Sequence, residues 1–129
     1  MTNGTILLAG LLLAGATEPP AAFKGDEDSF VSRSYSLFVD CVARSAVGTI
    51  EKKSRASASA IADAAFAACG DEALLYRMQL QTYLNDKDDP RQFSEAARDE
   101  AETIYQRRVQ MFHRNVVNAI PKLRAEKTK

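Results

Sequence analysis

Apolar residues recur at intervals of three and four along most of the chain after residue 29, which is the period of one α-helical face. Three helices are predicted. The first begins at Phe30, behind a candidate N-cap at Asp28 or Ser29, and ends before the charged connection 51–55. Its apolar face is expected to comprise Phe30, Ser34, Leu37, Phe38, Cys41, Val42 and Ser45.

The second helix is predicted to begin within 57–59 and to run toward Leu84. Its apolar stripe is Ile61, Ala65, Cys69, Ala73, Tyr76, Leu80 and Leu84. Gly70 and Asp71 leave two alternatives open. We favour one unbroken helix, because the apolar period continues through Gly70. The other alternative is a break at Gly70, with Asp71 as the cap of a new helix.

The third helix has the clearest start signal. Asp89 stands at the N-cap, Pro90 at the first helical position and Gln92 at the reciprocal capping position. Because Pro121 disfavours helical conformation in the residue before it, this helix is expected to end near Ala119. Its stripe is Phe93, Ala97, Ala101, Ile104, Arg108, Met111 or Phe112, Val116 and Ala119.

No segment shows the alternating pattern of a strand. The two longer helices are joined by a polar turn at 85–89, so they are expected to pack antiparallel. The predicted fold class is therefore all-α: a compact three-helix bundle whose first two helices are joined by a disulfide.

The N-terminal segment has the features of a secretory signal. Residues 6–16 form an uncharged apolar run that is shorter than the roughly 20 residues needed to span a bilayer, and Ala14-Gly15-Ala16 provides a small-residue cleavage site. An uncleaved anchor stays open as the alternative, because the leader contains no Lys or Arg. We expect a periplasmic or secreted protein with a signal peptide at 1–16, a flexible lead-in at 17–28, a helical domain at 29–120 and a basic tail at 121–129.

Cys41 and Cys69 are the only cysteines. Export would place them in an oxidising space, and both lie at similar distances from the connection between the first two helices. A disulfide is therefore predicted. Intermolecular bridging or free thiols remain as alternatives. A redox or metal-binding role for the two cysteines is the least favoured interpretation, since Cys-x-x-Cys is absent and a zinc site normally takes four ligands.

Two segments carry a family resemblance. Phe38-Val39-Asp40-Cys41-Val42 and the Ala-rich stretch 61–69 resemble small exported two-cysteine helical proteins of Gram-negative, sphingomonad-type bacteria. The resemblance covers about residues 30–80. It implies an exported helical protein and no site residue, because that group has no assigned activity.

The charges are unevenly distributed although 17 basic and 17 acidic residues balance. Residues 103–129 contain seven basic residues and one acidic residue. Such a segment can bind a polyanion or an anionic membrane surface, or it can be a solvated helix end that complements the helix dipole, which we favour. The candidate anion-binding residues are Arg107, Arg108, Arg114, Lys122 and Arg124.

No catalytic, metal or nucleotide-binding motif is present in the sequence, so no cofactor and no specific nucleic acid is expected. The single histidine, His113, is expected to be exposed or at a helix end. The leading functional hypothesis is an exported, non-enzymatic protein that binds another envelope protein as an adaptor, inhibitor or stress-related factor. Homodimerisation is a further candidate, because the long helices carry more apolar stripe than the first helix can cover. The alternative is the polyanion or membrane-surface binder, and an enzyme ranks third.

Overall fold

Four helices account for most of residues 30–52, 55–88 and 94–127, the parts of the chain that the computed structural model describes. They are α2 (Phe30–Glu51), α3 (Ala58–Ala68), α4 (Gly70–Asp88) and α5 (Glu95–Lys127). These ranges contain no strand, so the all-α class is confirmed. The expected number of three helices is wrong. The expected leader and lead-in lie outside the described residues.

The predicted second helix is divided at Cys69, and the expectation of an unbroken helix is wrong. Cys69 has φ −109° and ψ 30°, outside the helical region, and its N–H donates to the Phe66 carbonyl in a tightened last turn of α3. The carbonyl of Cys69 then accepts from the amide of Ala73, which begins α4. Asp71 and Glu72 stand in the first turn of α4, where negative charge is favoured.

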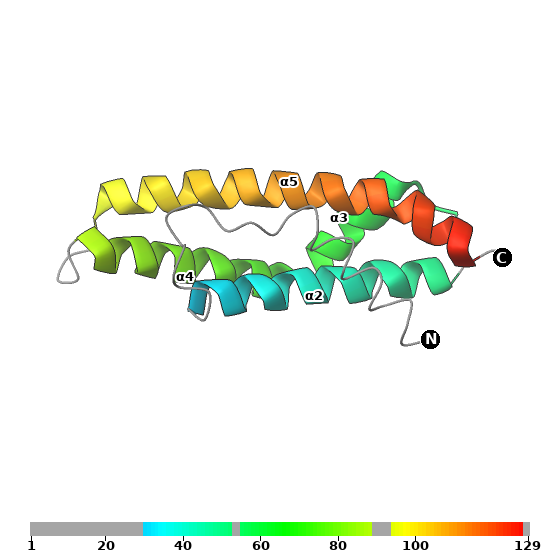
Figure 1. Ribbon diagram of the computed structural model, residues 1–129, viewed down its shortest axis with the longest axis horizontal. Helices are drawn as coiled ribbons and strands as arrows, with labels where there is room; N and C mark the ends of the chain where they lie inside the picture. Colours follow the sequence, from blue (N-terminus) through cyan, green and yellow to red (C-terminus); the bar gives the residue numbers. More distant parts are fainter. Residues whose placement is uncertain (1–29, 53–54, 89–93, 128–129) are drawn as a thin grey trace.

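α3 and α4 together occupy the place expected for one helix. α4 runs antiparallel to α2 and α5 and lies beside the N-terminal half of α2, whereas α3 lies toward its C-terminal half (Figure 1). Both also contact α5, and α2 and α5 contact each other. The division lets two shorter helices take different directions against the same pair of long helices.

Aromatic side chains form the centre of the core. Phe112 of α5 contacts Phe38 of α2 and Phe66 of α3, with ring centroids 5.4 and 5.0 Å apart. Tyr35 and Tyr76 join α2 to α4 with centroids 4.9 Å apart. The buried residues include most members of the stripes predicted for the second and third helices: Ile61, Ala65, Cys69, Tyr76, Leu80, Leu84, Ala97, Ala101, Phe112, Val116 and Ala119.

The predicted apolar face of the first helix is partly wrong. Phe30 and Leu37 are 70% and 53% exposed, while Val39 and Ala46 are buried. The buried face is rotated because α2 packs against α3, α4 and α5 together, so the side toward those helices is covered. Phe30 and Leu37 lie outside that covered side.

α5 continues through Pro121 to Lys127, so the helix end expected near Ala119 is wrong. A proline inside a helix costs about 3 kcal/mol because it lacks an N–H and crowds the preceding turn. Ile120 and Leu123 are nonetheless buried on either side of it. Burial of two such side chains contributes about 1.5–3 kcal/mol each, which offsets that cost. Pro121 itself is exposed.

A hydrogen bond joins the C-terminal part of α4 to the residue that precedes α5. The Oδ1 atom of buried Asn85 accepts from the Ser94 amide at 2.6 Å. The Ser94 hydroxyl in turn accepts from the amide of Ala97, so Ser94 is the N-cap that the structure shows for α5. The cap predicted at Asp89, Pro90 and Gln92 lies outside the described residues.

Candidate functional site

The predicted disulfide is confirmed. The sulfurs of Cys41 and Cys69 are 2.08 Å apart and the two Cα atoms are 6.0 Å apart. The bond joins α2 to the junction between α3 and α4. Cys69 is fully buried, whereas Cys41 is partly exposed. The disulfide therefore extends from the core to the surface of the bundle.

Glu72 lies beside this disulfide. One carboxylate oxygen of Glu72 and the sulfurs of Cys41 and Cys69 are all within 4.8 Å of one another. Cys69 is at the N-cap of α4 and Glu72 is at its third helical position, from which a side chain can reach back toward the cap. No motif in the sequence indicated a role for Glu72. The spacing Cys69-x-x-Glu72 would have indicated it only if the helix had been known to begin between them.

Arg108, one of the candidate anion-binding residues, is directed into the bundle. Its guanidinium carbon lies 4.7 Å from the ring centroid of Tyr35, and its side chain hydrogen-bonds Tyr76. Burial raises the pKa of Tyr76 to about 12 even though the Arg108 charge opposes that rise. The contacts give Arg108 a place in the packing of α2, α4 and α5, in agreement with its position on the predicted apolar stripe.

The other four basic residues do not form one cluster with it. Arg124 donates to the carbonyl oxygen of Ala56, which ties the end of α5 to the segment before α3. Arg107, Arg114 and Lys122 are exposed. Arg107 and Arg114 are about two turns apart and share a face of α5, and neither forms an ion pair with an acidic side chain among the described residues. Of the five candidates, at most these three exposed residues can contact an external anion.

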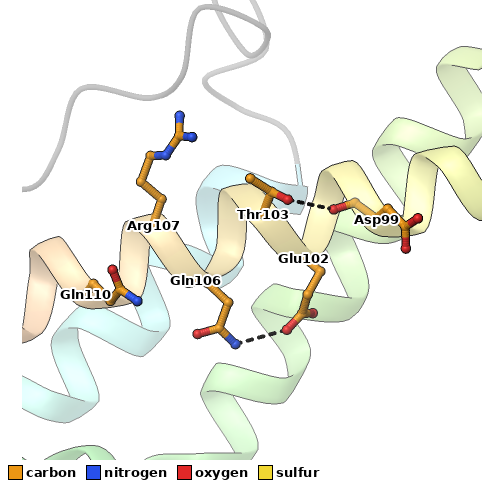
Figure 2. Close-up of a pocket in the computed structure, with 6 residues that line it drawn as sticks. All are labelled: Asp99, Glu102, Thr103, Gln106, Arg107 and Gln110. Atoms are coloured by element: carbon orange, nitrogen blue, oxygen red, sulfur yellow. Dashed lines mark hydrogen bonds between the residues drawn. The ribbon is translucent and has the colours of Figure 1, made fainter.

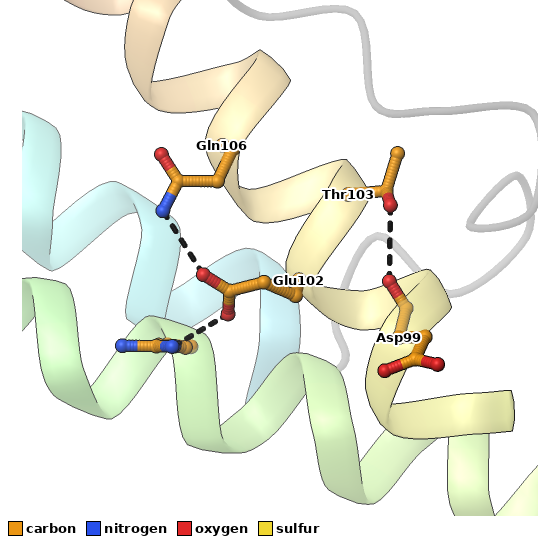
Figure 3. A network of polar contacts seen from close by, with 5 residues as sticks. Asp99, Glu102, Thr103 and Gln106 are labelled. Atoms are coloured by element: carbon orange, nitrogen blue, oxygen red, sulfur yellow. Dashed lines mark hydrogen bonds and ion pairs between the residues drawn. The ribbon is translucent and has the colours of Figure 1, made fainter. Parts of the chain in front are cut away.

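A polar network joins α4 to α5 near one open depression of about 560 Å³. The Nε atom of Arg77 donates to Glu102 at 2.7 Å, and Gln106 donates to the other oxygen of the same carboxylate at 2.9 Å. Thr103 donates to the Asp99 carbonyl (Figure 3). Figure 2 shows that Arg107 extends away from Glu102 and Gln106. The contact between Arg77 and Glu102 therefore links α4 to α5.

His113 has a partner that the sequence did not indicate. Its Nε2 atom lies 2.7 Å from Oδ1 of Asp63 on α3, and its ring lies 5.1 Å from that of Phe66. The His113 side chain is 33% exposed and lies in the middle of α5, so the expectation of a helix-end position is wrong. It lines a shallow groove of about 570 Å³ with Phe66, Val109, Gln110, Arg114 and Val117. The pair links two helices, and the residues that line the groove include no serine, threonine or cysteine.

Several large apolar side chains are exposed on α2 and α4. Leu37, Leu74 and Met78 are each 53% exposed and Leu75 is 41% exposed. Tyr35 opposite Tyr76 and Cys41 opposite Cys69 establish the antiparallel register, which brings Leu37 level with Leu74 and Leu75. Met78 follows Leu74 by one turn. We call these four residues the α2/α4 apolar surface.

None of the described helices is both long and apolar enough to cross a membrane. No protein-family model, curated protein or solved structure matches the chain. Inference about function therefore depends on the surface and chemistry of this molecule alone.

Proposed function

We propose that this chain is an exported, non-enzymatic helical protein that binds another envelope protein through the α2/α4 apolar surface. The single observation that carries the proposal is the exposure of Leu37, Leu74, Leu75 and Met78 at one level of two adjacent helices. Scattered exposed apolar residues are normal on a protein surface, but a group of them favours a binding face.

The position of this surface supports the proposal. Leucine and methionine side chains adapt readily to an apolar partner, and methionine is frequent at adaptable binding surfaces. The disulfide joins Cys41 on α2 to Cys69, the residue directly before α4. A crosslink of this kind keeps the helices in register, so less conformational freedom is lost when a partner binds.

Export is the second part of the proposal. A leader at 1–16 cleaved near Ala16 would deliver the chain to the periplasm or beyond, where disulfides persist. The disulfide supports that compartment. Intact mass of the protein purified from its native host tests it: loss of the leader and of two hydrogens is expected, and retention of the leader with two free thiols contradicts export.

Site-specific photo-crosslinking in the native envelope tests the binding surface. A photoreactive amino acid is placed at Leu74 or Met78, and a matched control carries it at Arg114, which is also exposed but on α5. The proposal expects discrete adducts from Leu74 and Met78 and none from the control. An adduct with twice the mass of the chain would identify the partner as a second copy, the homodimer expected from the sequence.

Equal adduct yields at all three positions, or none at Leu74 and Met78, would contradict a specific apolar binding face. The same variants are also examined by circular dichroism, so that a folded protein is established before the crosslinks are interpreted.

An anion-binding function is the second candidate, favoured by Arg107 and Arg114 on one face of α5 and by exposed Lys122. It predicts retention on vesicles of anionic lipid or on heparin at low salt, with loss of retention as the salt concentration rises. Reversal of Arg107 and Arg114 to glutamate should abolish retention. An unchanged elution position would exclude this surface.

A further inference from the structure

The disulfide region contains a third side chain of metal-ligating type. One oxygen of Glu72 lies within 4.8 Å of both cysteine sulfurs. We propose that, once the disulfide is reduced, Cys41, Cys69 and Glu72 form a binding site for a thiophilic divalent cation of the zinc class. The three residues come from α2, from the α3–α4 junction and from the first turn of α4.

The packing around the cysteines keeps the two sulfurs near one another after the bond opens. The two Cα atoms are 6.0 Å apart. On α2, Phe38 and Val42 are both buried beside Cys41, and Phe38 packs edge-on against Phe66 of α3 with centroids 5.6 Å apart. These contacts do not depend on the sulfur–sulfur bond. In the reduced protein, these apolar contacts therefore still hold α2 against the α3–α4 junction.

The distances suit a cation of this size. Zinc–sulfur bonds of about 2.3 Å in a tetrahedral site place two thiolate sulfurs about 3.8 Å apart. The two Cα atoms are 6.0 Å apart, which allows that sulfur spacing. Once the bond is open, rotation about the side-chain bonds of partly exposed Cys41 can move its sulfur away from that of Cys69.

The donor set determines which cations fit. Two thiolates favour zinc or cadmium over calcium and magnesium, which prefer oxygen ligands. Glu72 supplies a third donor, and the fourth position remains for water, as in zinc sites with three protein ligands. Cys41 and Glu72 are both partly exposed, whereas Cys69 is buried, so a cation can enter from the Cys41 side.

The reaction balances with a dithiol reductant. The reductant gives two electrons and two protons to the Cys41–Cys69 bond and itself becomes a disulfide. The two protein thiols then lose two protons as they bind the cation as thiolates. The cation would thereby replace the disulfide as the link between α2 and α4.

The test uses the full-length protein, reduced with a dithiol that is then removed without oxygen, and the oxidised protein in parallel. Zinc is added with a chromogenic chelator as competitor, and the thermal midpoint Tm is measured with and without zinc. The reduced protein should bind one zinc and gain Tm, and the oxidised protein should do neither. Glu72→Gln should weaken binding by about tenfold or more, equivalent to about 1.4 kcal/mol.

Asp71→Asn is the matched control. Asp71 is the preceding residue, is exposed, and carries the same charge in the same first turn of α4, but it is not among the three grouped donors. Its substitution should leave zinc affinity unchanged. The proposal is overturned if the two variants bind alike, if the oxidised protein binds as tightly as the reduced one, or if the reduced protein binds no zinc.

Discussion

Opening the Cys41–Cys69 bond should remove a large part of the stability of the folded chain. The two cysteines are separated by 28 residues, so the bond closes a loop of about 29 residues in the unfolded chain. Without the crosslink, the unfolded chain gains about 12 cal/mol/K, or about 3.6 kcal/mol at 25 °C in the chain-entropy model. A small domain is stable by only about 5–15 kcal/mol.

Urea unfolding followed by circular dichroism measures this loss, in a buffer with a chelator so that no metal replaces the bond. At a slope of about 2 kcal/mol/M, the midpoint of the reduced protein should fall by about 2 M. The double variant Cys41→Ala/Cys69→Ala should unfold at or below that midpoint, because Cys69 is fully buried and its truncation leaves space in the core. The variant controls for the reductant, which should not affect it. A loss below about 1 kcal/mol would refute the loop-entropy reasoning.

Three further perturbations test the packing. Phe112→Ala should lower the unfolding free energy by about 3–5 kcal/mol, because fully buried Phe112 contacts rings on α2 and α3; a loss under 1 kcal/mol in urea unfolding would show that the aromatic centre is not required. Ser57→Ala should cost about 1 kcal/mol, since the Ser57 side chain accepts from the amide of Ala60, and hydrogen exchange of that amide should accelerate. The pKa of Tyr76 is raised from 10.0 to about 12, so the folded state holds a proton that the unfolded state releases. The associated stability is fully present below about pH 10 and is lost as pH rises through about 12, and Tyr76→Phe should flatten this part of the pH profile of stability.

Local patterns predicted the features that depend on neighbouring residues along the chain. The stripes through Ile61, Tyr76 and Leu80 followed the helical period, and the core contains them. Cys41 and Cys69 lie at similar distances from one connection, and that connection folds the chain back on itself. The helical class and the disulfide could therefore be derived without coordinates.

Features that depend on which elements meet could not be derived in this way. The helix end near Ala119 followed from the local effect of Pro121, but the burial of Leu123 against other elements extends α5 beyond it. The charge of Arg108 predicted an exposed side chain, while its place on the apolar stripe predicted a buried one. The contact of Arg108 with Tyr35 shows that its side chain lies against the core.

The sequence by itself determined that this chain forms amphipathic helices and where their buried stripes run, because helical periodicity is a local property. Only the tertiary structure decided that the second predicted helix divides at Cys69, that Glu72 reaches the sulfurs, and that Asp63 meets His113 fifty residues away. Those contacts join separate helices, and the energy that selects them comes from packing of the whole bundle, which no single segment contains.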